Sequence, residues 1–338
     1  MKILITADPE LPVPPGLYGG IERIIDVLIH GYIKEGHSVT LCANAESQVP
    51  CKLIAWKGTR SQNLADTVKN TLTLTKTVLT GKFDIIHSFS RLAYMAPIMP
   101  LGIPKIMSYQ REPSIGQISK SAKLAKKKSL VFTGCSNYIT DQIAKVAEAV
   151  TVYNCAPFEK YTPTNSVEED APLVFLGRIE DIKGTDVAIQ VAQKTNRRLV
   201  IAGNIPATKE VYFEEKVKPF LNDRITYCGP VNDEQKNELL GKALAFLMPI
   251  QWNEPFGIVM AEAMACGAPV LGFPRGSVPE VVEDGVTGFI CKDADDMAEK
   301  VRAVSSLNRM RVRTRGEERF GNYKIVQDYL KLYKRLIN

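Results

Sequence analysis

The sequence predicts an α/β protein built from two doubly wound domains. Short apolar runs alternate with helical stretches up to Asn154, and the same alternation starts again after a linker. Continuous apolar strands separated by helices are typical of parallel sheets that helices cover on both faces. The length of 338 residues also exceeds the roughly 250 to 300 residues at which a single core stops growing. Because parallel sheets bind ligands at the carboxyl ends of their strands, we expect two facing domains with a ligand cleft between them.

The first domain is expected to span residues 1–158. Its strands are predicted in the runs KILIT, HSVTLCA, FDIIHSF, KIMSYQ, LVFTGCS and VTVYN, and a helix is predicted in GIERIIDVLIHGYIKEG. The segment APFEKYTPTNSVEEDAP, which begins at Ala156, is rich in Pro, Thr, Asn, Ser and acidic residues. Such a composition is typical of a linker.

The second domain is expected over residues 159–321, with strands in PLVFLG, RLVIAG, ITYCGPV, LAFLMPI, PVLGF and GFIC. The last stretch, residues 322–338, has a helical period and no strand after it. Its apolar and aromatic stripe consists of Ile325, Val326, Tyr329, Leu330, Tyr333 and Leu336. Because this stripe must be buried, we expect the terminal helix to rejoin the first domain.

Composition and charge exclude several classes of protein. No run approaches the roughly 20 apolar residues of a membrane span, so we expect a cytoplasmic protein. Seven cysteines, three histidines and the absence of a C-x-x-C pair favour reduced thiols over a zinc site or a disulfide framework. Up to Phe158 the chain has 18 Lys and Arg against 11 Asp and Glu. This basic excess suits an anionic surface or substrate, and it is also common on a plain solvated face.

A glycine-containing loop, PVPPGLYGGIER, lies between the first strand and the first helix. Gly19 and Gly20 would let backbone N–H groups approach a ligand, and a helix N-terminus attracts anions. Neither G-x-G-x-x-G nor G-x-x-x-x-G-K-[ST] occurs, so the common phosphate-binding loops are absent. A glycine pair by itself can also be only a turn.

A second loop, in FLGRIEDIKGTDVAI, carries Arg178 and Lys183 between a buried strand and a helix. A diphosphate needs fixed cationic partners, and Arg supplies a planar fork whereas Lys supplies a compact charge. Taken singly the two residues would be ordinary surface cations. Together at the carboxyl end of a strand they favour a diphosphate site.

The stretch EPFGIVMAEAMACGAPVLGF places two glutamates around the start of an apolar helix. An unpaired buried carboxylate costs several kcal/mol as a rough figure, so Glu262 needs a partner. The loop amides could take a phosphate, Glu262 could accept from ribose hydroxyls, and Glu254 could accept from the hydroxyls of a sugar. A phosphorylated, polyhydroxylated ligand would supply the partners that both carboxylates need.

The order and spacing of these motifs resemble those of the retaining glycosyltransferases of family 4, which have two facing Rossmann-like domains, the GT-B architecture. The resemblance covers nearly the whole chain and includes the glycine loop, G-R-x-x-x-x-K-G at 177–184, the E-x7-E pair, CGAPVLGF and VPEVVEDGVTGFI. It implies a hexosyltransferase that uses a nucleotide-diphosphate sugar, UDP- or GDP-sugar favoured, with no cofactor and no metal. The implied catalytic residues are Glu254, Arg178 and Lys183. The implied donor-binding residues are Gly19, Gly20, Gly203, Val231, Pro255, Phe256, Gly257, Ile258, Val259 and Glu262.

The acceptor half departs from the family pattern. Many relatives have H-x-H after a central strand, whereas this chain reads HSF, with His87 kept and Phe89 in the second position. A later stretch reads SYQRE, so Tyr109 and Arg111 stand where a histidine often does. We expect these three polar residues, His87, Tyr109 and Arg111, on the acceptor side. His87 could equally be a strand histidine whose hydrogen bonds are satisfied inside the domain.

The resemblance implies a saccharide, lipid-linked or small-molecule acceptor, as in polysaccharide or glycoconjugate biosynthesis, and no nucleic acid.

The segment SKSAKLAKKKSL, with five lysines between Lys120 and Lys128, could contact an anionic membrane at its inner face or could be a solvated helix face. Asp293-x-Asp295 has the form of a metal-binding D-x-D motif, but its place before a helical run favours a helix cap. The alternatives to a glycosyltransferase are an epimerase or phosphorylase of the same architecture, or a non-catalytic subunit that binds a sugar nucleotide.

Overall fold

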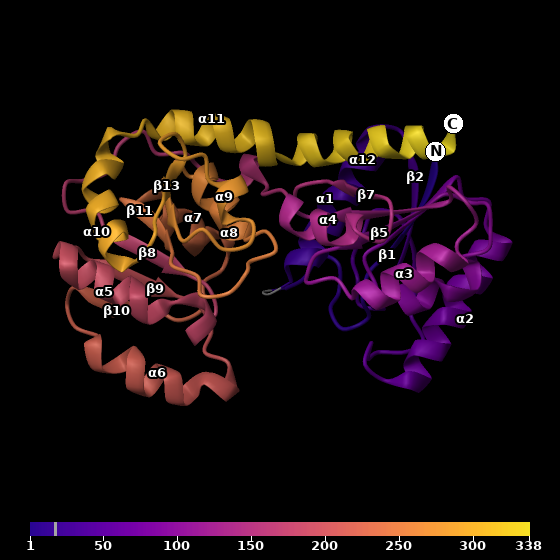
Figure 1. The fold of residues 1–338 in the computed structure, drawn as a ribbon, viewed down its shortest axis with the longest axis horizontal. Helices are drawn as coiled ribbons and strands as arrows, with labels where there is room; N and C mark the ends of the chain where they lie inside the picture. The colour runs from indigo at the N-terminus through magenta and orange to yellow at the C-terminus, as the bar shows by residue number, and fades with distance from the viewer. Residues whose placement is uncertain (17–18) are drawn as a thin grey trace. The chain divides into compact units, whose positions relative to one another are not determined.

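A computed structural model describes residues 1–16 and 19–338 (Figure 1). The chain divides into two compact units: the first comprises Met1–Asn154 and Asn322–Asn338, and the second comprises Cys155–Gly321. Each unit contains one parallel β-sheet with helices in its crossover connections. The predicted fold class, two doubly wound α/β domains, is therefore confirmed.

The sheet of the first unit has the strand order β3-β2-β1-β4-β5-β6-β7, and its described pairs are parallel. The strands are β1 (Lys2–Thr6), β2 (Ser38–Ala43), β3 (Lys52–Ala55), β4 (Ile85–Ser88), β5 (Lys105–Tyr109), β6 (Leu130–Gly134) and β7 (Ala149–Thr151). The central strands are buried on both faces, which explains their continuous apolar sequences. The edge strand β3 is absent from the sequence prediction because its run, KLIA, is short and only half-buried.

The described residues of the first unit form six helical segments. They are α1 (Gly20–Lys34), α2 (Leu64–Thr80), the 3-10 helix η1 (Leu92–Ile98), α3 (Ile115–Leu124), α4 (Asn137–Ala144) and the terminal α12 (Asn322–Ile337). Helix α12 packs on α1. Its Tyr333 hydroxyl lies 2.9 Å from that of Tyr32, and Arg335 pairs with Glu148 at 3.0 Å. The terminal helix thus buries its stripe in the first unit.

The sheet of the second unit has the strand order β10-β9-β8-β11-β12-β13. The strands are β8 (Leu173–Leu176), β9 (Leu199–Ala202), β10 (Ile225–Tyr227), β11 (Ala245–Met248), β12 (Val270–Gly272) and β13 (Gly288–Ile290). All six fall within the apolar runs in which strands are predicted. Their side chains form a core with α5 and α10, and β8 and β11 are neighbours at the point where the strand order reverses.

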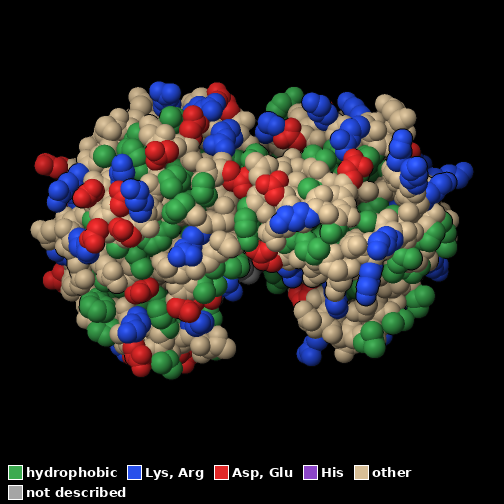
Figure 2. All heavy atoms as spheres, viewed as in Figure 1, with side chains coloured by type: hydrophobic (Ala, Val, Ile, Leu, Met, Phe, Trp, Pro, Cys, Tyr) green, Lys and Arg blue, Asp and Glu red, His purple; other side chains and the backbone are tan. Residues whose placement is uncertain are grey.

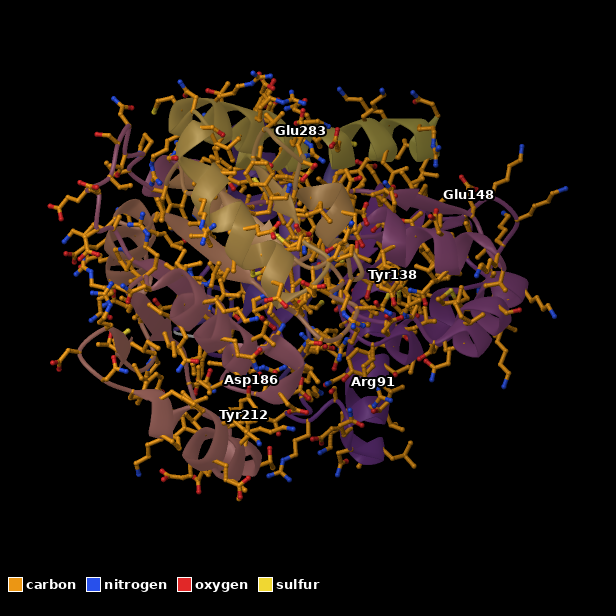
Figure 3. The ribbon with its side chains drawn as sticks, turned by 60° about the vertical axis from the view of Figure 1, so that its left-hand side comes forward. Arg91, Tyr138, Glu148, Asp186, Tyr212 and Glu283 are labelled. Atoms are coloured by element: carbon orange, nitrogen blue, oxygen red, sulfur yellow. The ribbon has the colours of Figure 1, made fainter. Side chains whose placement is uncertain are left out.

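Some helices of the second unit begin at a residue whose side chain caps the first turn, whereas others have no side-chain cap. The helical segments of this unit are η2 (Phe158–Lys160), η3 (Asp181–Lys183), α5 (Thr185–Thr195), η4 (Ala207–Lys209), α6 (Glu210–Lys216), η5 (Lys218–Phe220), α7 (Asp233–Gly241), α8 (Ile258–Ala265), α9 (Val278–Val281), α10 (Ala294–Ala303), η6 (Val304–Ser306) and α11 (Arg309–Phe320). Asn232 and Gln235 form a capping box on α7. The Tyr212 hydroxyl on α6 donates to Asp186 Oδ1 on α5 at 2.8 Å (Figure 3).

The structure divides after Asn154, whereas the sequence boundary is placed after Phe158. The difference arises because Ala156 N–H donates to Phe320 O, and Phe158 O accepts from Arg313. The start of the predicted linker is therefore held by α11 of the second unit. Within residues 1–16 and 19–338, no helix is both long enough and apolar enough to cross a membrane.

Candidate active site

The loop after β8 presents Arg178 and Lys183 at the carboxyl end of that strand. Arg178 is 40% exposed and pairs with Glu180 at 2.8 Å. Gly184 follows the 3-10 turn η3 with a left-handed φ of 74°, and a Cβ there would lie 2.1 Å from Pro249 O. Only glycine allows this approach, so the loop after β8 packs directly on the loop after β11.

Lys183 and Glu254 meet where these two loops pack. Lys183 Nζ lies 2.6 Å from Glu254 Oε2, and Trp252 Nε1 donates to the same oxygen at 3.2 Å. Lys183 Nζ also lies 4.9 Å from the centre of the Trp252 ring. Because the side chains of Lys183 and Glu254 are only 18% and 12% exposed, the pair is a partly desolvated, oriented feature and not a mobile surface contact.

Residues that follow β12 fix the backbone around Glu254. Ser277 N–H donates to Glu254 O at 2.9 Å, and Ser277 Oγ donates to Phe256 O at 2.9 Å. Gly276 has a φ of 58°, and a Cβ there would lie 2.4 Å from Glu254 N. Two loops therefore hold the position of Glu254, and sequence reasoning missed both Gly276 and Ser277.

Helix α8 begins immediately after this loop. Gly257 is its N-cap residue with a φ of 73°, and no side chain caps the helix start. Pro255 and Phe256 precede it, and Ile258 and Val259 form its first turn. The predicted donor-binding residues from Pro255 to Val259 are thus consecutive around one helix start, where backbone N–H groups and the helix dipole favour an anion.

Glu262 lies one turn further into α8 and is only 7% exposed. Its Oε1 accepts from Tyr161 Oη at 2.9 Å and from Lys236 Nζ at 2.5 Å. Sequence reasoning sought the partners of this carboxylate in a ligand, whereas the second unit itself provides two of them. Burial, with the charge of Glu262 as a second cause, raises the pKa of Tyr161 well above its ordinary value, so its hydroxyl remains a donor.

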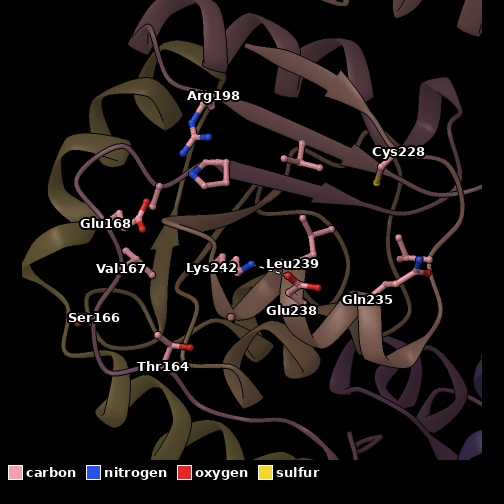
Figure 4. A pocket seen from close by; sticks show the side chains of 15 residues that line it. Thr164, Ser166, Val167, Glu168, Arg198, Cys228, Gln235, Glu238, Leu239 and Lys242 are labelled. Carbon is pink, nitrogen blue, oxygen red and sulfur yellow. Dashed lines mark hydrogen bonds and ion pairs between the residues drawn. The ribbon is translucent and has the colours of Figure 1, made fainter. Parts of the chain in front are cut away.

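Gly203 and Val231 lie after β9 and β10. A Cβ on Gly203 would lie 1.7 Å from Gly177 O, so glycine is required there by the close approach of two strand ends. Val231 lines a cavity of about 680 Å³ together with Cys228, Gln235 and Leu239 (Figure 4). Arg178, Lys183, Glu254 and Glu262 are not among the residues that line this cavity, so the structure does not group Val231 with them.

The glycine loop of the first unit leads into α1. Gly19 has a φ of 149°, and a Cβ there would lie 2.7 Å from Pro15 Cβ and 2.8 Å from Glu22 Oε2. Gly20 is the first residue of α1. Residues 17 and 18 of the quoted motif lie outside the described part of the chain. The close contacts explain the need for glycine at position 19.

Acidic side chains, which sequence reasoning missed, lie beside this loop. Glu22 is 7% exposed, and burial raises its pKa. Burial likewise raises the pKa of Asp8, although Arg111 pairs with this carboxylate at 2.9 Å. One signal that could have indicated these residues is their position, directly after β1 and at the start of α1.

A cavity of about 400 Å³ lies at the carboxyl ends of β4 and β5 in the first unit. Its lining includes the predicted residues Tyr109 and Arg111, together with Phe89, Arg91 and Lys120. Burial raises the pKa of Tyr109 to about 12, so its hydroxyl is protonated near neutral pH. The cavity thus combines an aromatic wall with three cations.

His87 is fully buried and does not line this cavity. Its Nδ1 lies 2.5 Å from the Tyr333 hydroxyl and its Nε2 lies 2.7 Å from Ser108 Oγ. Burial lowers its pKa to about 3. This geometry fits one of the two roles that the sequence allows for His87, a strand histidine whose hydrogen bonds are made inside the domain.

The D-x-D motif lies at the start of α10. Asp293 is the N-cap residue, and its Oδ1 accepts from the N–H groups of Asp295 and Asp296. Asp295 pairs with Lys194 of α5. The interpretation of Asp293 as a helix cap is confirmed. Among the described residues, no group of three or more His, Cys, Asp and Glu is arranged to hold a metal ion.

Comparison with known proteins identifies relatives of the chain. Residues 159–319 match the family model of the glycosyl transferases group 1. The chain is 30% identical to the phosphatidylinositol N-acetylglucosaminyltransferase gpi3 subunit of Schizosaccharomyces pombe, over 48% of this chain and 36% of that protein. It is 24% identical to an uncharacterized 41.2 kDa protein in the cps region of Klebsiella pneumoniae, over 94% of this chain and 96% of that one. The chain spans less than half the length of several other curated relatives that it matches.

Solved structures share the fold over the whole chain. AviGT4, a glycosyltransferase involved in avilamycin A biosynthesis, matches with a TM-score of 0.75 and 24% identity, over 99% of this chain and 98% of that one. Anabaena Alr3699/HepE, in complex with UDP and glucose, matches with a TM-score of 0.75 and 18% identity, over 99% and 100% of the two chains. At sequence identities of 24% and 18%, the similarity to these two structures shows the fold alone.

Proposed function

Because the chain is a family 4-like glycosyltransferase with the GT-B fold, we propose that it transfers a sugar from a nucleotide-diphosphate sugar to an acceptor hydroxyl, with retention and without a metal. The observation that carries this proposal is the pair of Lys183 and Glu254, 2.6 Å apart at the carboxyl ends of two neighbouring strands. It places a cation suited to a phosphate beside a carboxylate suited to sugar hydroxyls. The N-terminus of α8 adjoins Glu254 in the chain and adds a second anion-attracting group.

Each residue of this group has a distinct role in the proposal. Arg178 and Lys183 bind the diphosphate, since each charge-assisted hydrogen bond contributes about 1.5 to 3 kcal/mol. Glu254 accepts from the hydroxyls of the transferred sugar. Glu262, whose Oε1 is already bonded to Lys236 and Tyr161, accepts from ribose hydroxyls with its remaining lone pairs.

The proposed chemistry is a displacement on one face of the sugar. The acceptor oxygen bonds to the anomeric carbon while the bond from that carbon to the phosphate oxygen breaks, and the departing phosphate takes the proton of the acceptor hydroxyl. Negative charge gathers on the leaving diphosphate, where Arg178 and Lys183 stabilise it more strongly than in the ground state. The anomeric carbon gains oxocarbenium character, which the carboxylate of Glu254 favours.

Donor and acceptor are proposed at the level of class. The complex of the Anabaena neighbour with UDP and glucose makes a UDP-sugar the first donor to test, ahead of a GDP-sugar. The acceptor is a saccharide, lipid-linked or small-molecule hydroxyl compound, bound on the side of the 400 Å³ cavity in the first unit. We place the enzyme in the cytoplasm, in peripheral contact with the inner face of the membrane.

A panel of UDP-, GDP- and ADP-sugars in a thermal-shift assay, followed by product analysis, tests the proposal. A ligand at 100 times its dissociation constant stabilises the fold by about 2.7 kcal/mol. Arg178→Met should weaken nucleotide-diphosphate binding by at least about tenfold. Arg315→Met is the matched control, because Arg315 is 39% exposed and ion-paired like Arg178 but lies on α11. Equal effects of the two variants would contradict the diphosphate role.

Two other functions remain as outcomes of the same assay. Turnover of the sugar nucleotide without an acceptor, or dependence on inorganic phosphate, would indicate an epimerase or a phosphorylase. Tight nucleotide binding with no turnover against any acceptor would indicate a non-catalytic subunit. The oriented Lys183–Glu254 pair favours the transferase, because binding alone does not need a carboxylate held beside the phosphate cation.

A further inference from the structure

The outward face of α2 leaves large apolar side chains in solvent. They are between 51% and 79% exposed, while the opposite face of the helix, with Asn70, Leu74 and Val78, is buried. Spacings of four, four and seven residues place the exposed side chains in one stripe along the helix. The α2 stripe consists of Leu64, Val68, Leu72 and Leu79.

Exposed lysines lie on the same helix as this stripe and on α3 with the turn after it. Lys69 and Lys76 are exposed on α2 itself, and α3 with the turn after it adds a second group. Both α2 and α3 contact η1, so they belong to one layer of the first unit. The α3 group consists of the exposed lysines Lys120, Lys123, Lys126, Lys127 and Lys128, with Leu124 61% exposed among them.

Acidic residues are scarce in this part of the chain. Between Asp66 and Glu112 the sequence contains one acid, Asp84, and no acid occurs from Ile115 to Leu130. Figure 2 shows hydrophobic and basic side chains over the region of α2 and α3, with few acidic ones. The docking face, defined as the α2 stripe with the α3 group, is therefore both apolar and positively charged.

This combination fits one class of partner better than the others. An anionic bilayer can accept leucine side chains at the acyl boundary while lysine ammonium groups remain among the lipid phosphates. A second copy of the chain would place the α3 lysines against one another, which is repulsive. A nucleic acid would neutralise the lysines but would leave the leucines in water.

We propose that the first unit docks on an anionic lipid bilayer through the α2 stripe and the α3 group. The inference rests on the proposed function in one respect, since docking would bring a lipid-linked acceptor to the enzyme. Ser61 and Gln62, just before α2, and Lys120 of α3 line the 400 Å³ cavity. The docking face thus begins at residues that line the acceptor-side cavity.

Vesicle sedimentation of the full chain tests the proposal. Vesicles of phosphatidylcholine alone are compared with vesicles that also contain phosphatidylglycerol, at low and at high salt. Lys123→Gln with Lys127→Gln should reduce partitioning at low salt by about fivefold per lysine, and much less at high salt. Val68→Gln with Leu72→Gln should reduce it at least about tenfold at either salt, because burial of apolar groups does not depend on charge screening.

Matched controls come from α6 of the second unit. Val211 is 69% exposed and Lys216 is exposed, so Val211→Gln with Lys216→Gln should leave vesicle binding unchanged. All substituted side chains face solvent, and melting curves should coincide with the wild type. The proposal would be overturned if the wild-type protein failed to sediment with anionic vesicles at low salt. It would also be overturned if the α2 variant, Val68→Gln with Leu72→Gln, bound vesicles as well as the wild type does.

Two further measurements distinguish the membrane-docking proposal from a dimer interface and from the proposed function. A dimer in size-exclusion chromatography that the α2 variant dissociates would assign the docking face to a second copy and overturn the membrane proposal. Calorimetry with UDP or GDP in solution reports on the donor site without any membrane. Intact nucleotide binding with no vesicle binding would remove the docking face alone, whereas loss of nucleotide binding would contradict the proposed function.

Discussion

Lys236 Nζ lies 2.5 Å from Glu262 Oε1, and the side chains of these two residues are only 12% and 9% exposed. A carboxylate so far from water is costly unless it is paired. The counterion comes from α7 and a hydroxyl partner, Tyr161, from the segment before β8. The protein thus holds Glu262 paired and oriented before any ligand arrives.

The first prediction concerns the removal of this counterion. Lys236→Met should destabilise the second unit by about 3 kcal/mol, because the variant leaves a buried carboxylate without its cation. Denaturant unfolding in a Trp56→Phe background measures the effect, since Trp252, the other of the two tryptophans, then reports on the second unit.

A lysine on the same stretch of chain provides the control. Lys242 pairs with Glu238 and is 72% exposed, so Lys242→Met should leave the unfolding midpoint unchanged. A Lys236→Met protein as stable as the Lys242→Met protein would mean that Glu262 is neutral or hydrated in the fold.

The sequence around Glu262 indicates that this carboxylate needs a partner but does not indicate which residue the partner is. The apolar helix around Glu262 shows that the carboxylate is buried, and this is a local property of the sequence. Lys236 lies 26 residues away and Tyr161 lies 101 residues away, and neither has a pattern that marks it. Only the packing of α7 and of the segment after η2 against α8 brings the three side chains together.

The second prediction separates the two glutamates. Glu262→Gln should weaken binding of the free nucleotide diphosphate, because an amide accepts ribose hydrogen bonds less strongly than a carboxylate. Glu254→Gln should spare that binding and lower turnover by about 100-fold or more, because Glu254 faces the transferred sugar in the proposal. Calorimetry and a product assay measure both effects. Unchanged nucleotide affinity in Glu262→Gln would remove its ribose role.

The third prediction is that transfer persists in excess EDTA. Arg178, Lys183 and the start of α8 supply the positive charge that a metal would otherwise bring to the diphosphate. Asp293→Asn with Asp295→Asn should leave turnover nearly unchanged and cost less than about 1 kcal/mol of stability, since Asn also caps helices well. Loss of activity on chelation, restored by Mn²⁺ or Mg²⁺, would contradict the assignment of Arg178 and Lys183.

The fourth prediction concerns acid stability of the first unit. His87 has a pKa of about 3 in the fold and an ordinary value near 6.5 when unfolded. The unfolded chain therefore binds more protons between these values, so stability falls as pH drops below 6.5. Between pH 7 and pH 5 this residue alone should account for a loss of about 2 kcal/mol.

His87→Gln should remove this part of the pH dependence, although the variant starts from a lower stability. Denaturant unfolding at both pH values, in a Trp252→Phe background that leaves Trp56 as the reporter, measures it. The control is His30→Gln, since His30 is 59% exposed on α1. A His87→Gln protein with the full wild-type pH dependence would show that another group is responsible.

The fold followed from the sequence more completely than the site. The motif resemblance to family 4 is confirmed for residues 159–319 by the group 1 match, and all six strands of the second unit lie in runs predicted from the apolar pattern. In the first unit, the half-buried strand β3 (Lys52–Ala55) was missed because its pattern is weak. Gly276 and Ser277 hold Glu254 in place through contacts with its backbone. Such contacts leave no periodic pattern in the sequence.

The last prediction tests how the terminal helix is joined to the first unit. Gly31 lies in α1 where α12 crosses it, and a Cβ there would lie 2.3 Å from Val326 Cγ2. Gly31→Ala should therefore destabilise the first unit by about 1 to 3 kcal/mol, although alanine is the better helix former. Gly116→Ala on α3 is the control, since a Cβ there meets nothing within 4 Å, and it should be neutral or slightly stabilising. Adding Val326→Ala to Gly31→Ala should recover part of the loss, because it removes the methyl groups that clash. If Gly31→Ala were as harmless as Gly116→Ala, or if Val326→Ala only added to the loss, the close packing of α1 on α12 would be contradicted.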